Sequence, residues 1–107
     1  MNMREALDAI VASCDLINRT FDNFWVCYDD YLTDEITKEE AEEFGLLDRN
    51  SVEARLNGYA FCVTDKYGCD LLKVYLDVYK KKQTSQFARY VCIYTTDGQI
   101  IDDIFSI

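Results

Sequence analysis

The chain contains no histidine, no proline and only four glycines among its 107 residues. Without histidine it lacks the commonest general base, the usual activator of a serine or cysteine nucleophile, and the commonest metal ligand. The four glycines are isolated from one another, so no glycine-rich phosphate-binding loop is present. The lack of proline and the scarcity of glycine argue against linkers. We therefore expect residues 1–107 to form a single, non-enzymatic domain without a metal or cofactor.

Long apolar runs are also absent. No stretch approaches the roughly 20 apolar residues of a membrane-spanning helix, and acidic residues interrupt the apolar run at the N-terminus, unlike a signal peptide. The cysteines lack a Cys-x-x-Cys pair and are odd in number: Cys14, Cys27, Cys62, Cys69 and Cys92. These features indicate reduced, buried thiols in a cytoplasmic protein. The sequence pI of about 4.3 argues against direct binding to nucleic acid or an anionic membrane, because both would repel the chain.

The negative charge is concentrated in residues 29–48. This segment has nine acids and one base, Lys38, and contributes −8 to a net charge of −9. The rest of the chain holds 11 acids and 10 bases and is nearly neutral. A local excess of this size requires a local explanation.

Before this segment, residues 3–31 carry apolar side chains at steps of three and four. This spacing predicts one long amphipathic helix, supported by an Asp15–Arg19 pair on its polar side. Aromatic and branched residues at positions 24–28 also fit a strand, and Thr20 or Asp22 could end one helix and cap another. The apolar stripe fits either a helix packed on a sheet, which we prefer, or a coiled coil. Its members are Leu7, Ile10, Cys14, Ile17, Phe21, Phe24, Tyr28 and Tyr31.

Two short helices are expected next. Thr37 and Glu40 fit a capping box, and Ile36 and Ala41 fit a hydrophobic staple, for a helix over residues 38–44 that ends at a left-handed Gly45. Asn50 and Glu53 fit a second box, for a helix that has Val52 and Leu56 facing inward and stops at Gly58. Both predictions depend on local capping patterns alone.

After Gly58 the pattern alternates, as in strands. We expect strands over residues 59–64, 71–79, 87–95 and 99–105, with a turn at 65–68 and a polar loop at 80–86. In the second strand, Leu72, Val74, Leu76 and Val78 should point to one face, and Lys73, Tyr75, Asp77 and Tyr79 to the other. Asp97-Gly98 predicts a two-residue type I′ hairpin that pairs Thr96 with Gln99. That register places acids on both faces of the last strand, so we expect either a bulge near Asp102 or partial cover of both faces.

The sequence thus predicts an α+β fold, with a long N-terminal helix and two short helices followed by a four-stranded antiparallel β-meander. The candidate binding surface is its acidic segment. The simpler interpretation of this segment is a solvated helix that keeps the protein soluble. Like charges at i,i+4, such as Glu39 and Glu43, weaken a helix, however, so solubility alone does not explain them. The candidate residues are Asp29, Asp30, Asp34, Glu35, Glu39, Glu40, Glu42 and Glu43, with Tyr75 and Tyr79 as apolar anchors.

Tyr75, Tyr79, Tyr90 and Tyr94 could also form an aromatic strip across two neighbouring strands. It would be either a protein-binding surface or a sheet face packed under a helix.

The leading functional hypothesis is a small inhibitor that occupies the basic nucleic-acid-binding cleft of a partner protein. Carboxylates at this density approach the charge spacing of a phosphate strand. Phage-encoded antagonists of bacterial defence, such as anti-CRISPR or anti-restriction proteins, are compact, acidic and non-enzymatic in this way. The alternatives are an immunity or adaptor protein that neutralises a basic partner without mimicry, and a homodimer joined through the helical stripe.

Overall fold

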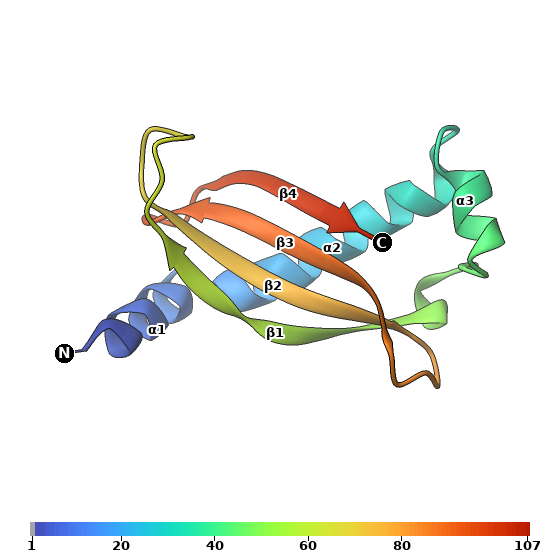
Figure 1. Ribbon diagram of the computed structural model, residues 1–107, viewed down its shortest axis with the longest axis horizontal. Helices are drawn as coiled ribbons and strands as arrows, with labels where there is room; N and C mark the ends of the chain where they lie inside the picture. The colour runs from blue at the N-terminus through green and yellow to red at the C-terminus, as the bar shows by residue number, and fades with distance from the viewer. Residues whose placement is uncertain (1) are drawn as a thin grey trace.

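The helices come first along the chain and the sheet second, as expected. In the computed structural model, which describes residues 2–107, the helices are α1 (Met3–Ser13), α2 (Leu16–Thr33), α3 (Lys38–Glu43) and the 3-10 turn η1 (Arg49–Ser51). The strands are β1 (Val52–Cys62), β2 (Leu71–Lys80), β3 (Gln86–Thr95) and β4 (Ile100–Ser106). They form one antiparallel sheet in the order β1-β2-β3-β4, and α2 crosses one face of it (Figure 1). The predicted α+β meander is confirmed.

The two faces of the sheet differ as the alternation in β2 predicts. Leu72, Val74, Leu76 and Val78 are fully buried on the face that α2 covers, which we call the inner face. Lys73, Tyr75, Asp77 and Tyr79 are half-buried on the opposite, outer face. No helix lies over the outer face in Figure 1.

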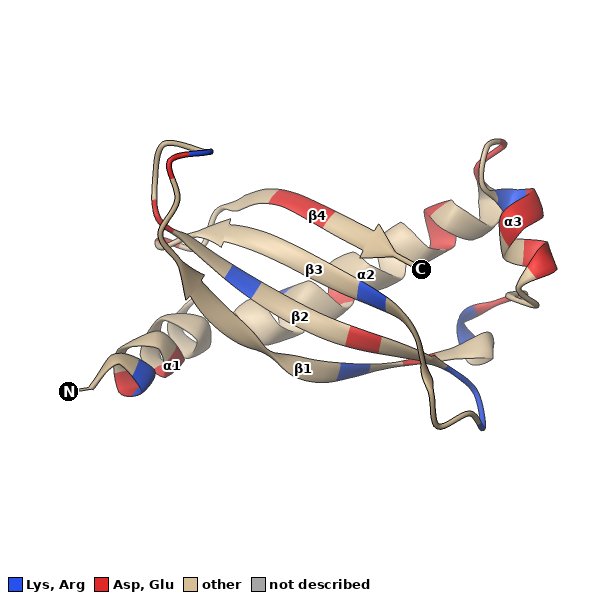
Figure 2. Ribbon diagram, in the orientation of Figure 1, with Lys and Arg blue, Asp and Glu red and all other residues tan. Residues whose placement is uncertain are grey.

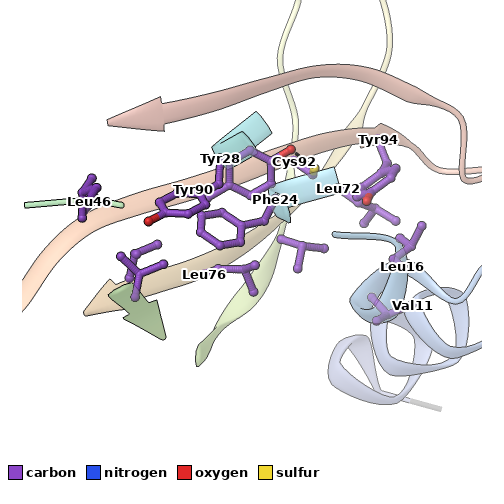
Figure 3. Close-up of a cluster of buried hydrophobic side chains, with 14 of the residues drawn as sticks. Val11, Leu16, Phe24, Tyr28, Leu46, Leu72, Leu76, Tyr90, Cys92 and Tyr94 are labelled. Carbon is purple, nitrogen blue, oxygen red and sulfur yellow. Dashed lines mark hydrogen bonds between the residues drawn. The ribbon is translucent and has the colours of Figure 1, made fainter. Parts of the chain in front are cut away.

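The core forms where α2 meets the inner face (Figure 3). Phe24 is fully buried, and its ring centroid lies 5.8 Å from that of Tyr28, 5.5 Å from that of Tyr90 and 6.0 Å from that of Phe105. Residues 24–28 lie within α2 and are helical, which settles the ambiguity between helix and strand. The apolar stripe of residues 7–31 packs on the sheet and not along a second helix, and this is the arrangement that we preferred.

The prediction of one continuous N-terminal helix is wrong. Asp15 adopts the left-handed conformation, with φ of 52° and ψ of 41°, and separates α1 from α2. Asp tolerates this conformation better than most residues because its side chain bonds locally, and Asn18 Nδ2 donates to Asp15 Oδ1 at 2.9 Å. The break rotates the apolar stripe, so Leu16 and Thr20 are buried in α2 although the spacing did not select them.

A distant hairpin holds this break in place. Arg19 does not pair with Asp15 as predicted; its Nη1 donates to the carbonyl oxygens of Gly98 at 2.7 Å and Cys14 at 3.3 Å. Gly98 is buried and has a φ of +87°, and a Cβ at this position would lie 2.9 Å from the Cys14 Cβ and Sγ atoms. The β3–β4 hairpin therefore contacts the backbone at the junction of α1 and α2.

The second predicted short helix does not exist. Asp48, not Asn50, caps η1, in a capping box with Ser51. Val52 then begins β1, which pairs with β2 from Val52 opposite Lys80 to Cys62 opposite Leu71. A bulge between Leu56 and Gly58 accommodates Asn57 in this pairing. Val52 is buried as predicted, but Leu56 is 41% exposed. Pairing with β2 along the whole strand outweighs the local capping pattern.

The last hairpin differs in its turn type. Gly98 N–H donates to the Thr95 carbonyl at 3.0 Å and Thr95 N–H donates to the Gln99 carbonyl at 2.8 Å, so three residues form the loop. Asp97 lacks a positive φ, which type I′ requires. From Arg89 to Ile93, β3 pairs with β4 in the expected register. The predicted bulge near Asp102 is present, because Ile93 pairs with Asp102 whereas the next residue, Tyr94, pairs with Ile100. Because Tyr94 then pairs with Ile100, Ile100 lies on the inner face with Tyr94.

The buried tyrosines give the fold an expected sensitivity to alkali. Burial raises the pKa of both Tyr28 and Tyr94 from 10.0 to about 12, and burial with a hydrogen bond to Asp103 raises that of Tyr90. Unfolded tyrosines ionise first, so the stability that these groups contribute is complete below about pH 10 and is lost as the pH rises towards 12. Circular dichroism should change together with the ionisation of these three tyrosines, which is followed for each one in the NMR spectrum. Ionisation of Tyr28, Tyr90 and Tyr94 with midpoints near pH 10 in a chain that stays folded would contradict this expectation.

Candidate protein interface at the acidic end

The predicted carboxylates gather at one end of the molecule. Asp29 and Asp30 lie in the last turns of α2, Asp34 and Glu35 in the connection that follows, and the other four in α3. Figure 2 shows α3 with its acidic residues at the end of the molecule opposite α1. We call the eight side chains together the acidic end: Asp29, Asp30, Asp34, Glu35, Glu39, Glu40, Glu42 and Glu43.

The turn before α3 is organised by Asp34 and not by the predicted capping box. Asp34 Oδ1 accepts from the Ile36 N–H at 2.8 Å, and the Asp34 carbonyl accepts from Lys38 N–H at 2.9 Å. Thr37 makes no side-chain cap; its hydroxyl donates to the Tyr31 carbonyl at 2.8 Å. The predicted staple is also wrong, because Ile36 is 89% exposed while Ala41 is buried.

The C-terminal end of α3 is fixed as the sequence predicts. Gly45 has a φ of +78°. Its N–H donates to the Glu42 carbonyl at 3.0 Å, and Leu46 N–H donates to the Ala41 carbonyl at 2.9 Å, which is a Schellman motif. Leu46 and Ala41 are both buried. Packing of these two residues holds a helix that is too short to be stable alone.

Two of the eight carboxylates are neutralised within the chain. Arg49 contacts both Asp29 oxygens, with Nη2 to Oδ2 at 2.6 Å, and this hydrogen bond lowers the pKa of Asp29. Lys38 Nζ pairs with Glu35 Oε2 at 3.1 Å. The Asp29–Arg49 pair links residues 20 positions apart, so no local pattern indicated it.

Of the other six acids, Asp34 accepts the hydrogen bond from Ile36 N–H and five remain free. Within residues 2–107, Asp30, Glu39, Glu40, Glu42 and Glu43 are exposed and form no ion pair. Four of these lie in α3, whose six residues span about 9 Å at about 1.5 Å per residue. This is roughly one negative charge per 2–3 Å, at least as dense as a phosphate strand with one per 3.4 Å.

The two predicted tyrosine anchors lie elsewhere. Tyr75 and Tyr79 are on the outer face, where the guanidinium carbon of Arg55 lies 4.5 Å from the Tyr79 ring centroid and that of Arg89 lies 5.8 Å from the Tyr75 ring centroid. The acidic end is attached to α2, on the inner side of the sheet. Tyr90 and Tyr94 are fully buried under α2. The predicted strip of four tyrosines is therefore wrong, since β3 turns its pair inward.

Other kinds of site are not apparent in the part of the chain that the structure describes. Residues 2–107 contain no group of three or more cysteine, aspartate or glutamate side chains arranged to hold a metal ion. Among the helices described there, none has the length and apolar character needed to cross a membrane.

Comparisons with known proteins add no assignment: no protein-family model, curated protein or solved structure matches this chain.

Proposed function

We propose that this chain is a non-enzymatic inhibitor that inserts its acidic end into the basic cleft of a nucleic-acid-binding protein. The observation that carries the proposal is the set of five exposed, unpaired carboxylates at one end of the molecule. A cationic cleft attracts such a surface for the same reason that it attracts a phosphate backbone. The acidic end would thereby exclude the nucleic acid.

The position of the charges in α3 supports binding as their role. Glu39 and Glu40 lie in its first turn, where the helix dipole favours acids, but Glu42 and Glu43 lie in its last turn, which has no base. Negative charge at a helix C-terminus lowers helix stability by a few tenths to about 1 kcal/mol. A helix selected for stability or solubility alone would place bases there.

Neutralisation of four acids in α3 should strongly weaken partner binding. We compare the variant Glu39→Gln, Glu40→Gln, Glu42→Gln and Glu43→Gln with a control that neutralises exposed acids outside the acidic end: Glu5→Gln, Asp22→Asn, Asp65→Asn and Asp70→Asn. Both variants change the net charge of −9 by the same four units. Each tagged protein is incubated at low salt with heparin-binding proteins from a bacterial lysate and eluted with rising salt. The first variant should lose at least about tenfold in association rate with the retained partner, and the control should lose little.

Competition then separates mimicry from simple charge neutralisation. Duplex DNA or single-stranded RNA is added to the purified complex at constant ionic strength. Displacement of the chain by nucleic acid supports occupation of the cleft. A partner that holds nucleic acid and the chain together would instead support the immunity or adaptor alternative. Equal binding by both Gln/Asn variants would show that the acidic end is not the binding surface.

A further inference from the structure

An open apolar groove lies at the end of the molecule opposite the acidic end. It separates α1 from the second half of β1 and has a volume of about 690 Å³. Its apolar lining comes from Met3, Leu7 and Ile10 on α1 and from Gly58, Tyr59 and Phe61 on β1. Tyr59 and Phe61 pair with Val74 and Leu72, so they belong to the inner face, which α2 leaves uncovered at this edge.

Helix α1 is poorly covered for a helix of its length. It has 11 residues, and Val11 is its one fully buried side chain. Isolated helices shorter than about 12–15 residues are marginal in water. The exposed part of its apolar face is the part that lines the groove, and Met3 there is 79% exposed. Additional cover on this face would therefore stabilise α1.

The groove borders an unpaired sheet edge. Strand β1 is the outermost strand of the sheet, so one side of its backbone presents free N–H and C=O groups to another chain. The first half of β1 also exposes apolar surface on the inner face: Leu56, opposite the buried Leu76, is 41% exposed. The edge thus offers both hydrogen-bonding groups and apolar side chains.

The exposed surface of the whole chain is larger than its mass predicts. The area is 6721 Å², whereas about 6,200 Å² is usual for a monomer of this mass. The radius of gyration is 15.1 Å, against about 13 Å for a compact domain of this length. The excess of about 500 Å² approaches the roughly 800 Å² that each partner buries in a standard interface.

Charge allows a second copy at this edge, unlike at the acidic end. The residues of α1 and β1 carry Arg4, Glu5, Asp8, Glu53 and Arg55, a net charge of −1 from three acids and two bases. The strongly negative α3 lies at the far end of the molecule (Figure 2). Two copies joined along β1 therefore meet at nearly neutral surfaces and keep their acidic ends apart.

We propose that this chain forms a two-fold dimer in which the β1 strands of two copies pair antiparallel and each copy fills the groove of the other. A two-fold axis perpendicular to the sheet keeps both inner faces on the same side and sets the second half of one β1 against the first half of the other. Ala54 and Leu56 of one copy then lie beside Tyr59 and Phe61 of its partner, over the partner's α1. Each copy supplies both the groove and the side chains that fill it.

Analytical ultracentrifugation from about 1 µM to about 1 mM tests the dimer, a range suited to an interface of modest area. The mass should double across this range. Leu56→Glu and Phe61→Glu should each remove the dimer, because each places a carboxylate in the apolar contact. Ile104→Glu is the matched control: Ile104 is also partly exposed, at 47%, but lies on the other edge strand, β4, and its variant should dimerise like the native chain.

Hydrogen exchange of the native chain gives a second readout that does not depend on how the variants fold. Backbone amides in β1 should exchange more slowly at high than at low protein concentration, while those of β4 should be unaffected. The proposal is overturned if the chain stays monomeric at about 1 mM, if β1 exchange is independent of concentration, or if folded Leu56→Glu and Phe61→Glu variants still dimerise. A monomer that binds an extended apolar peptide along β1 would overturn it as well.

Discussion

Replacement of Phe24 by alanine is expected to lower the free energy of unfolding by about 3–5 kcal/mol. Phe24 is fully buried and its ring meets Tyr28 from α2, Tyr90 from β3 and Phe105 from β4. The substitution removes the transfer free energy of a large apolar ring and leaves a cavity, because the surrounding aromatic rings are fixed by their own packing. Urea denaturation followed by circular dichroism measures the change.

The same substitution at Phe61 is the matched control. Phe61 is 41% exposed and lies at the edge of the sheet, so its truncation in dilute protein should cost about 1 kcal/mol. Equal losses at the two positions would mean that α2 is not held to the sheet by the cluster around Phe24. A loss of 5 kcal/mol would leave little of the roughly 5–15 kcal/mol typical of a natural domain.

Replacement of Gly98 by alanine should cost about 2–4 kcal/mol, from two separable causes. A φ of +87° is strained for any residue with a Cβ, and the added methyl group would lie 2.9 Å from Cys14. At this distance either the hairpin or the Cys14 side chain must shift to admit the methyl group. The midpoint and slope of urea denaturation report the loss.

Gly68 separates these two causes. Its φ is +74°, but no atom lies within 4 Å of its added Cβ, so Gly68→Ala carries the backbone strain alone, about 1–2 kcal/mol. The difference between the two variants measures the close contact of Gly98 with Cys14. Equal values would show that this contact does not contribute to stability.

The sheet could be predicted from the sequence more fully than the helices. The alternation in β2 requires no knowledge of its neighbours, because a strand buried on one face repeats every two residues. The break at Asp15 had no such signal, since it depends on Gly98 and Arg19, which meet only in the folded chain. The capping pattern at Asn50 and Glu53 was misleading for the same reason, because β2 pairs with that segment.

The candidate surface was predicted in part. The acids of α3 are exposed as the composition of the segment indicated, and Gly45 ends the helix as expected, although the capping box and staple before α3 are not formed. Composition did not show that Asp29 would be neutralised by Arg49, because this pair depends on a tertiary contact. The alternation in β2 did place Tyr75 and Tyr79 on the face opposite its apolar side chains, and their choice as anchors beside the acids is inconsistent with that alternation. The α1–β1 groove was not predicted either, since it requires the helix break at Asp15 that separates α1 from α2.

The contact between Arg19 and Gly98 joins residues 79 positions apart, and this separation constrains the order of folding. During synthesis α1 and α2 leave the ribosome well before the hairpin that fixes their junction. The two helices can form early, since their contacts are local, whereas closure of so long a loop is slow. Until the β3–β4 hairpin is made, the apolar faces of α1 and α2 lack part of their cover and are exposed to aggregation.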